Sequence, residues 1–222
     1  MNWLAHLYLS EAEVEFRVGN LLPDWVGPWE MVGLPEGFQR GIARHRRIDA
    51  FTDAHPMVRR SVRRFEKPFR RYGAVLTDVF YDHFLAAGWS EHSAVPLGEF
   101  VSGFYESVEA IRPSIPAQAW EVLEHMRAAD WLGSYATLPG IETTLRRMSR
   151  RLRRPFDLAA AVRVLEKEYE GFREDFEAFF PEVRREVGET AACEWWSGGV
   201  MICASAGASW SAVAEMHGAS LH

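Results

Sequence analysis

The sequence has only two cysteines, Cys193 and Cys203, and both lie in the segment 188–222. A disulfide framework or a thiolate zinc site needs several cysteines spread along the chain, so neither can hold the main body together. Any metal bound in that body must therefore use histidine and carboxylate side chains.

The sequence also lacks long apolar runs. Its first residues, MNWLAHLYLS, have none of the basic residues that begin a secretory signal. Nowhere do about 18 apolar residues follow one another, as a membrane-spanning helix requires. We therefore expect a cytoplasmic protein that has no membrane anchor and no membrane partner.

Alternating runs rich in β-branched residues are nearly absent, which argues against a sheet. Apolar residues instead recur every three or four positions, as in helices that bury one face. The segments with this pattern are 36–54, 75–89, 97–112, 116–136, 141–152 and 157–180. Prolines fall between these segments, where a proline ends one helix or starts the next; they are Pro56, Pro96, Pro113, Pro116, Pro139, Pro155 and Pro181. We predict an all-α fold with a single helical domain over residues 1–187.

Residues 188–222 differ in composition from the rest of the chain. They contain many small residues, scattered tryptophans and few charged residues, without a steady period. We expect this segment to be an atypical C-terminal tail, whose role the sequence does not indicate.

The charge of the chain is unevenly distributed. The formal net charge of −6 argues against a nucleic-acid partner. Basic residues are nevertheless concentrated in two windows, and the window 144–155 holds six arginines and no acid. The window 59–72 contains Arg59, Arg60, Arg63, Arg64, Lys67, Arg70 and Arg71 with one acid, Glu66. Its basic residues return to one side of a helix, so we predict a patch that binds an acidic partner; a merely solvated surface is the alternative.

The stretch RHRRIDAFTD, residues 44–53, places His45, Asp49 and Asp53 at intervals of four. On a helix they share one stripe. The residue before Pro56 is driven out of the α region, so the helix should end there and leave both aspartates near its carboxyl end. The helix dipole disfavours negative charge at that end, and a bound cation or a neighbouring arginine would offset it. The alternative is a solvated surface pair, which contributes only about 0.2–0.5 kcal/mol.

A second cluster lies in TDVFYDHF, where Asp78 and Asp82 are one turn apart and His83 follows Asp82. The surrounding residues are strongly apolar, and a carboxylate buried among them must be paired or metal-bound to stay charged. We expect these groups to belong to a site, with pairing to an arginine as the alternative.

Two further candidates, His6 and Asp24, lie near the start of the chain. Taken singly, His6 is also consistent with a core histidine, and Asp24 with a helix N-cap. Carboxylates combined with imidazoles and without thiolates suit Mn²⁺, Mg²⁺ or Fe²⁺ better than structural zinc. Mn²⁺ is the cation that we expect first.

Five motifs occur in order over residues 1–184: MNWLAHLYLS, GNLLPDW, HRRIDAFTD, DVFYDHFLAAGW and FEAFFPEV. With these motifs the chain resembles the acyl carrier protein phosphodiesterases of fatty acid biosynthesis. The resemblance implies a distorted HD-phosphohydrolase-like fold and a divalent metal, typically manganese. It also implies hydrolysis of the phosphodiester that joins 4′-phosphopantetheine to a serine of acyl carrier protein.

The resemblance implies a site that contains Asp24, His45, Asp49, Asp78, Asp82 and His83, with His6, Asn20 and Asp53 as additions. We expect the metal ligands to be His45, Asp49, Asp78, Asp82, His6 and Asp53. Proton transfer is expected from Asp24 or His83, and a phosphate contact from Arg46 or Arg47. The His-Asp order of HD enzymes is reversed here as Asp82-His83, so ligand roles cannot be transferred from those enzymes.

Two other functions remain open from the sequence. One is an HD-type nucleotide or (p)ppGpp phosphohydrolase, because a shared scaffold does not fix the chemistry. The other is a non-catalytic helical adaptor that binds an acidic partner through its basic windows. A metal analysis and a substrate comparison would distinguish these functions from a carrier protein phosphodiesterase.

Overall fold

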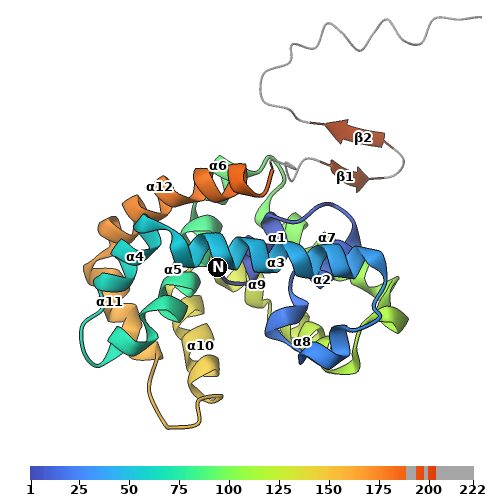
Figure 1. Cartoon of the computed structure of the whole chain (residues 1–222). Helices are drawn as coiled ribbons and strands as arrows, with labels where there is room; N and C mark the ends of the chain where they lie inside the picture. The colour runs from blue at the N-terminus through green and yellow to red at the C-terminus, as the bar shows by residue number, and fades with distance from the viewer. Residues whose placement is uncertain (189–193, 198–199, 204–222) are drawn as a thin grey trace, which may run out of the picture.

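The computed structural model describes residues 1–188, 194–197 and 200–203, and its body is helical (Figure 1). The helices are α1 (Trp3–Tyr8), α2 (Val14–Gly19), η1 (Leu22–Asp24), η2 (Pro28–Met31), α3 (Glu36–Ala54), α4 (Pro56–Arg63), η3 (Phe69–Tyr72), α5 (Gly73–Ala87), α6 (Trp89–His92), α7 (Leu97–Glu109), η4 (Arg112–Ser114), α8 (Ala117–Ala128), α9 (Trp131–Ser134), α10 (Leu138–Ser149), η5 (Ala159–Ala161), α11 (Val162–Lys167) and α12 (Tyr169–Glu186). The predicted all-α fold of the body is confirmed. Strands β1 (Glu194–Ser197) and β2 (Val200–Cys203) pair antiparallel within the segment predicted as a tail.

Helix α3 organises the molecule. It is 19 residues long and crosses the front of the body in Figure 1, with α2, α7 and α8 at one end and α4, α11 and α12 at the other. It contacts α2, α4 and α12 directly, and α5 packs against α1, α4 and α12. The N-terminus lies between α3 and α5 (Figure 1). The α-amino group of Met1 lies close to Asp49 of α3 and Asp78 of α5.

The core is built largely from aromatic side chains. Phe172, Phe176 and Phe180 recur every fourth residue of α12 and are buried. They meet aromatic rings of α5, with ring centroids 5.3 Å apart for Phe80 and Phe172 and 5.5 Å apart for Tyr81 and Phe176. Each buried phenylalanine contributes roughly 1.5–3 kcal/mol through removal of its surface from water. This packing fixes α5, which carries part of the site.

Helices α2 and α3 touch backbone to backbone because glycines lie where they cross. A Cβ atom on Gly41 of α3 would overlap the carbonyl oxygen of Phe16, and one on Gly19 of α2 would overlap that of Phe38. Side chains larger than hydrogen are therefore excluded at both positions. This close approach brings Asn20, the residue that caps α2, against the middle of α3.

Several predicted helix boundaries were correct and others were wrong. Helix α3 spans the predicted 36–54. The predicted helix 116–136 is instead two helices, α8 and α9, because Asp130 adopts a left-handed conformation with φ 41° and caps α9 through Gly133 N. Pro181 lies inside α12 rather than between helices. A proline removes one backbone donor, and here buried Phe179 and Val183 keep the helix packed on both sides of it.

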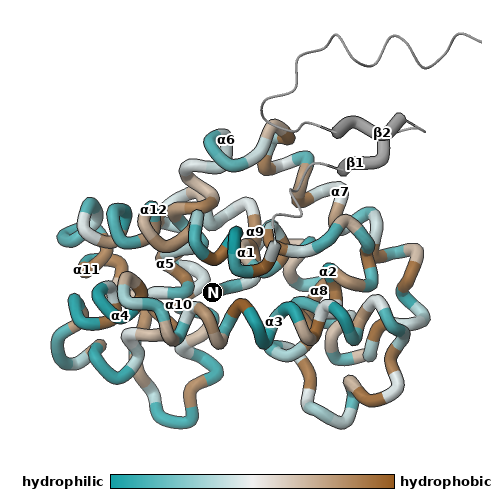
Figure 2. Tube along the Cα trace, turned by 45° about the horizontal axis from the view of Figure 1, so that its top comes forward, coloured by the Kyte–Doolittle hydropathy of each residue, from teal (hydrophilic) through white to brown (hydrophobic). Residues whose placement is uncertain are grey.

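Figure 2 shows hydrophilic and hydrophobic residues mixed along the helices, as expected when each helix buries one face. Among the residues that the structure describes, no helix combines the length and the apolar character needed to cross a bilayer.

Candidate metal centre

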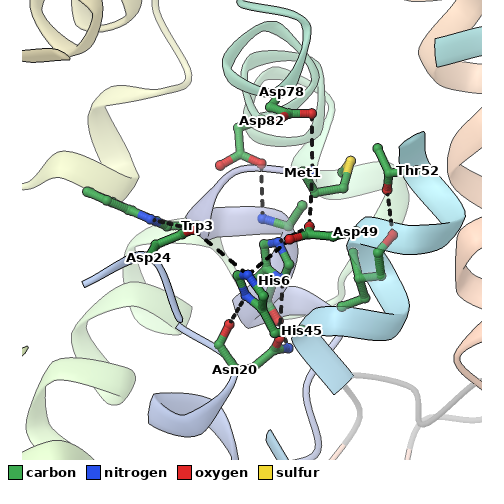
Figure 3. Close-up of polar contacts among 12 residues, drawn as sticks. Met1, Trp3, His6, Asn20, Asp24, His45, Asp49, Thr52, Asp78 and Asp82 are labelled. Carbon is green, nitrogen blue, oxygen red and sulfur yellow. Dashed lines mark hydrogen bonds and ion pairs between the residues drawn. The ribbon is translucent and has the colours of Figure 1, made fainter. Parts of the chain in front are cut away.

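Three side chains from two helices converge near the N-terminus (Figure 3). His6 comes from α1, while His45 and Asp49 lie one turn apart on α3. His6 Nε2 is 3.2 Å from Asp49 Oδ1, and His45 Nε2 is 3.0 Å from Asp49 Oδ2. The imidazole rings are stacked with their centroids 4.2 Å apart. These residues offer three ligand atoms that all lie within 4.8 Å of one another.

Asn20 fixes the orientation of both imidazoles. Its side-chain nitrogen donates to the carbonyl oxygen of His6 and to Ser10 Oγ, so its Oδ1 must face His6 Nδ1, 3.1 Å away. Its backbone oxygen lies 2.8 Å from His45 Nδ1. Carbonyl oxygens only accept hydrogen bonds, so both Nδ1 atoms carry a hydrogen. In their neutral forms both rings therefore carry a free lone pair on Nε2, the ring nitrogen close to Asp49. Metal-binding histidines are oriented in the same way.

The protonation of the two rings differs. Burial lowers the pKa of His6, so its ring is neutral at pH 7, and its buried Nε2 has no hydrogen-bond partner. Burial also acts to lower the pKa of His45, but the Asp49 carboxylate outweighs it and the pKa is raised. For Asp49, burial acts to raise the pKa, but the contact with His45 is the largest of the opposing effects and the pKa is held well below its usual range.

The donor set fits a divalent cation. A neutral His6 places a lone pair 3.2 Å from a carboxylate oxygen, and these two electron-rich atoms repel each other unless a positive charge lies between them. Two imidazole nitrogens and a carboxylate oxygen suit Mn²⁺, Fe²⁺ and related ions. The carboxylate of Asp49 is 41% exposed while both imidazoles are buried, so the cluster is open to solvent on its carboxylate side.

Two more aspartates border this cluster. Asp24 Oδ1 lies 3.8 Å from His45 Nε2, and its Oδ2 accepts a hydrogen bond of 3.0 Å from Trp3 Nε1. Asp78 Oδ1 lies 3.1 Å from the α-amino nitrogen of Met1, which in turn lies 3.7 Å from Asp49 Oδ1. Burial acts to lower the pKa of this amino group, but the neighbouring carboxylates outweigh it and raise the pKa. Sequence reasoning did not identify Met1 or Trp3, because neither has a distinctive spacing.

Comparison with known proteins decides the family. The family described as "Acyl carrier protein phosphodiesterase" matches residues 1–183. The chain belongs to this family. An acyl carrier protein phosphodiesterase of Yersinia pestis is 32% identical over 190 residues, which is 84% of this chain and 97% of that protein. Those of Escherichia coli O139:H28 and Salmonella agona are 33% and 32% identical over 192 residues, 86% of this chain and 100% of each protein. No solved structure matches the chain.

Asp82 is positioned differently from its neighbour Asp78. It is fully buried, and its two oxygens accept hydrogen bonds from the backbone N–H groups of Leu4 and Ala5, at 2.8 and 3.1 Å. Burial raises its pKa to about 7 although these two hydrogen bonds act to lower it. Asp82 therefore holds the N-terminus of α1, the helix that carries His6, rather than presenting a free oxygen to the cluster.

Four other predicted site residues lie outside the cluster. His83 uses both ring nitrogens elsewhere, Nδ1 at 2.9 Å from the Tyr135 carbonyl oxygen and Nε2 at 3.0 Å from the Tyr169 hydroxyl. Arg47 pairs with Glu186 at 2.9 Å. Two further residues are exposed on α3, Arg46 beside His45 and Asp53 one turn beyond Asp49.

The basic residues of the window 59–72 divide into two groups. Arg60 and Arg64 donate to the fully buried carboxylate of Asp175 and tie α4 to α12, with a distance of 3.0 Å for Arg64 Nε. Arg59 donates to the backbone oxygen of Asp53. The remaining basic residues of the window are exposed and, within the described part of the chain, form no ion pair with an acidic side chain; they are Arg63, Lys67, Arg70 and Arg71.

Proposed function

We propose that this chain hydrolyses the phosphodiester bond that joins 4′-phosphopantetheine to a serine of acyl carrier protein. The products are apo carrier protein and free 4′-phosphopantetheine. The observation that carries this proposal is the convergence of His6 Nε2 and His45 Nε2 on the Asp49 carboxylate, with both rings oriented by Asn20. The names of the relatives, which cover most of the chain, support the choice of substrate.

In this proposal His6, His45 and Asp49 hold one divalent cation, with Asp24 and Asp78 at its border. Mn²⁺ is the first choice, and Mg²⁺ or Fe²⁺ are the alternatives, because the donors are nitrogen and oxygen without thiolate. When bound, such an ion lowers the pKa of a water molecule and neutralises charge on phosphoryl oxygens. Asn20 and Asp82 act as positioning residues, since one orients the imidazoles and the other holds α1.

Asp24 is proposed as the proton-transfer group. Its Oδ2 is held by Trp3 Nε1, which leaves Oδ1 facing the cluster, 3.8 Å from His45 Nε2. Hydrolysis adds a water oxygen to phosphorus and breaks the bond from phosphorus to the serine oxygen, which must receive a proton as it leaves. A partly exposed carboxylate held in one orientation at the border of the cluster is suited to move that proton. Arg46, exposed beside His45, is proposed to contact the phosphate.

The test is to incubate the purified protein with holo carrier protein and Mn²⁺ and to follow loss of the prosthetic group by mass spectrometry. Full loss of the 4′-phosphopantetheine mass, abolished by a chelator and restored by Mn²⁺, is the expected result. His6→Ala and His45→Ala should lower bound Mn²⁺ and activity together. His125→Ala is the matched control because His125 is an exposed histidine on α8.

Two outcomes would reject the proposal. Hydrolysis of (p)ppGpp or another nucleotide, with holo carrier protein left intact, would assign the chain to nucleotide chemistry. Binding of holo carrier protein without bound Mn²⁺ and without mass loss would indicate an adaptor.

A further inference from the structure

We propose that the carrier protein docks on a basic surface formed where the two arginine windows meet. This surface, the basic junction, consists of Arg70, Arg71, Arg150, Arg151, Arg153 and Arg154. The inference rests on the proposed function, since it names the place where the acidic protein substrate of that reaction binds.

Aromatic contacts bring the two windows together. The ring of Phe156, in the loop after α10, lies 4.7 Å from the Tyr72 ring and 5.7 Å from the Phe69 ring, centroid to centroid. The guanidinium carbon of Arg71 lies 5.0 Å from the centroid of the same Phe156 ring. Residues of η3 and of the loop 150–157 are thus held against each other, although they are far apart in the sequence. Their arginines form one surface and not two separate patches.

The positive charge of the basic junction is not balanced by acidic side chains. Its six arginines are exposed, and among the described residues none of them forms an ion pair with a carboxylate. Some exposed arginines elsewhere are paired, as Arg127 is with Glu109 and Arg173 with Glu170. The chain as a whole carries a net charge of −6. Six unpaired cations in one place on an acidic protein repel one another, and an acidic partner relieves that repulsion.

A hollow beside these arginines has a shape that suits a protein partner. It is an open depression of about 480 Å³ lined by Arg146, Ser149, Arg150, Pro155, Phe156 and Asp157. Pro155 and Phe156 give it apolar surface and Arg150 gives it positive charge, while Arg146 pairs with Glu142. Its one carboxylate, Asp157, accepts a hydrogen bond from Ala159 N at 3.0 Å. Such a hollow accommodates an apolar side chain flanked by carboxylates on an acidic helix, whereas a nucleic-acid backbone offers no apolar group of that kind.

The basic junction is connected to the metal centre through two elements. Helix α5 begins directly after η3, so Asp78 lies roughly 9 Å along the helix axis from Tyr72, six residues earlier. On α10, the Arg147 guanidinium carbon lies 4.5 Å from the Trp131 ring centroid. Trp131 stacks on Trp3, whose Nε1 donates to Asp24. A carrier protein bound at the junction would therefore contact elements that continue into the site.

The experiment compares Arg70→Glu/Arg150→Glu with wild type, using holo carrier protein for kinetics and apo carrier protein for direct binding. We expect KM and the Kd for apo carrier protein to rise at least about 10-fold at low salt, with kcat unchanged and the difference shrinking at high salt. Arg185→Glu is the matched control, because Arg185 is an exposed arginine of α12 that donates only to the backbone oxygen of Pro181 in the described structure. Circular dichroism checks that each variant is folded.

The possible results separate this inference from the proposed function. If wild type hydrolyses holo carrier protein and the double variant keeps the wild-type KM and Kd, the basic junction is not the docking surface. If wild type does not hydrolyse holo carrier protein, the proposed function fails, and the apo carrier protein Kd alone decides the docking surface. Duplex DNA is the second probe: if it binds wild type more tightly than apo carrier protein and loses that binding in the double variant, the junction is a nucleic-acid surface and the inference is overturned.

Discussion

Replacement of Asn20 by alanine tests the metal centre most directly without removing a ligand. The change deletes the acceptor for His6 Nδ1 and two donors, which bond to the His6 carbonyl oxygen and to Ser10 Oγ. The bond from His45 to the backbone oxygen of residue 20 is kept. Loss of such a partner beyond the ligands typically reduces metal affinity about 10–100-fold. We therefore expect the Kd for Mn²⁺ to rise by that factor in Asn20→Ala, equivalent to about 1.4–2.8 kcal/mol.

The same change should also lower stability, because Asn20 is fully buried and its former partners lose hydrogen bonds. Each buried group left unsatisfied costs about 1–3 kcal/mol. Isothermal titration with Mn²⁺ gives the affinity, and urea unfolding without metal gives the stability. Ser10→Ala is the control, because it removes a partner of Asn20 but leaves the contact between Asn20 and the His6 ring.

A folded Asn20→Ala protein that binds Mn²⁺ with wild-type affinity would refute the reasoning. It would mean that the orientation of His6 is unimportant for the metal, and that His6 is not a ligand. Equal losses of Mn²⁺ affinity in Asn20→Ala and Ser10→Ala would also refute it, because the loss would then result from a general loosening of α1 and not from the orientation of the His6 ring. Full recovery of kcat at saturating Mn²⁺ is expected if Asn20 only positions His6.

Three further predictions concern stability. Burial raises the pKa of Asp82 to about 7 from an ordinary value of 3.8, so its contribution to stability is complete below pH 4 and is lost as pH rises through 7. In urea unfolding without metal, wild type should lose roughly 3 kcal/mol between pH 5 and pH 8 relative to Asp82→Asn, and parallel pH profiles would contradict this. Arg64→Ala removes a partner of the buried Asp175 carboxylate and should lower the free energy of unfolding in urea by about 3–5 kcal/mol. Arg63→Ala, at the neighbouring exposed position, should change it by less than about 0.5 kcal/mol. Equal effects of the two changes would refute the division of the basic window into two groups. Gly41→Ala should push α2 away from α3, lower the free energy of unfolding by about 1–3 kcal/mol and weaken Mn²⁺ binding in titration. Wild-type stability together with wild-type Mn²⁺ affinity would show that the helix crossing does not position the site.

The parts of the site that lie within one helix could be predicted from the sequence. His45 and Asp49 lie four positions apart and therefore on one side of the helix. The end of α3 follows from the restriction that Pro56 places on His55. Spacing alone could not show which aspartate of α5 faces the cluster. Asp78 and Asp82 are one turn apart on the same helix, and only the position of α1 directs Asp82 to backbone N–H groups.

Contacts between residues of different elements could not be predicted from the sequence for the same reason. The pattern of the window 59–72 predicts one basic side of a single helix, but the window is divided between α4 and η3. Arg60 and Arg64 face a buried aspartate on α12, which the pattern could not show. The meeting of the two basic windows likewise depends on a loop and a 3₁₀ helix packed around Phe156. Helical periodicity describes one element at a time, whereas these contacts depend on how elements pack.

The positively charged partners of the carboxylates in this chain favour a metal centre over an adaptor whose acidic residues form only salt bridges. Asp175, a buried carboxylate that ties α12 to α4, pairs with two arginines. Asp24, Asp49 and Asp78 lie close together, yet no lysine or arginine side chain of the described residues forms an ion pair with them. The groups that can carry positive charge beside these aspartates are the imidazoles of His6 and His45 and the α-amino group of Met1. Burial keeps the His6 imidazole neutral. We propose that an exchangeable divalent ion supplies further positive charge to these carboxylates, at a place where an arginine would block the site.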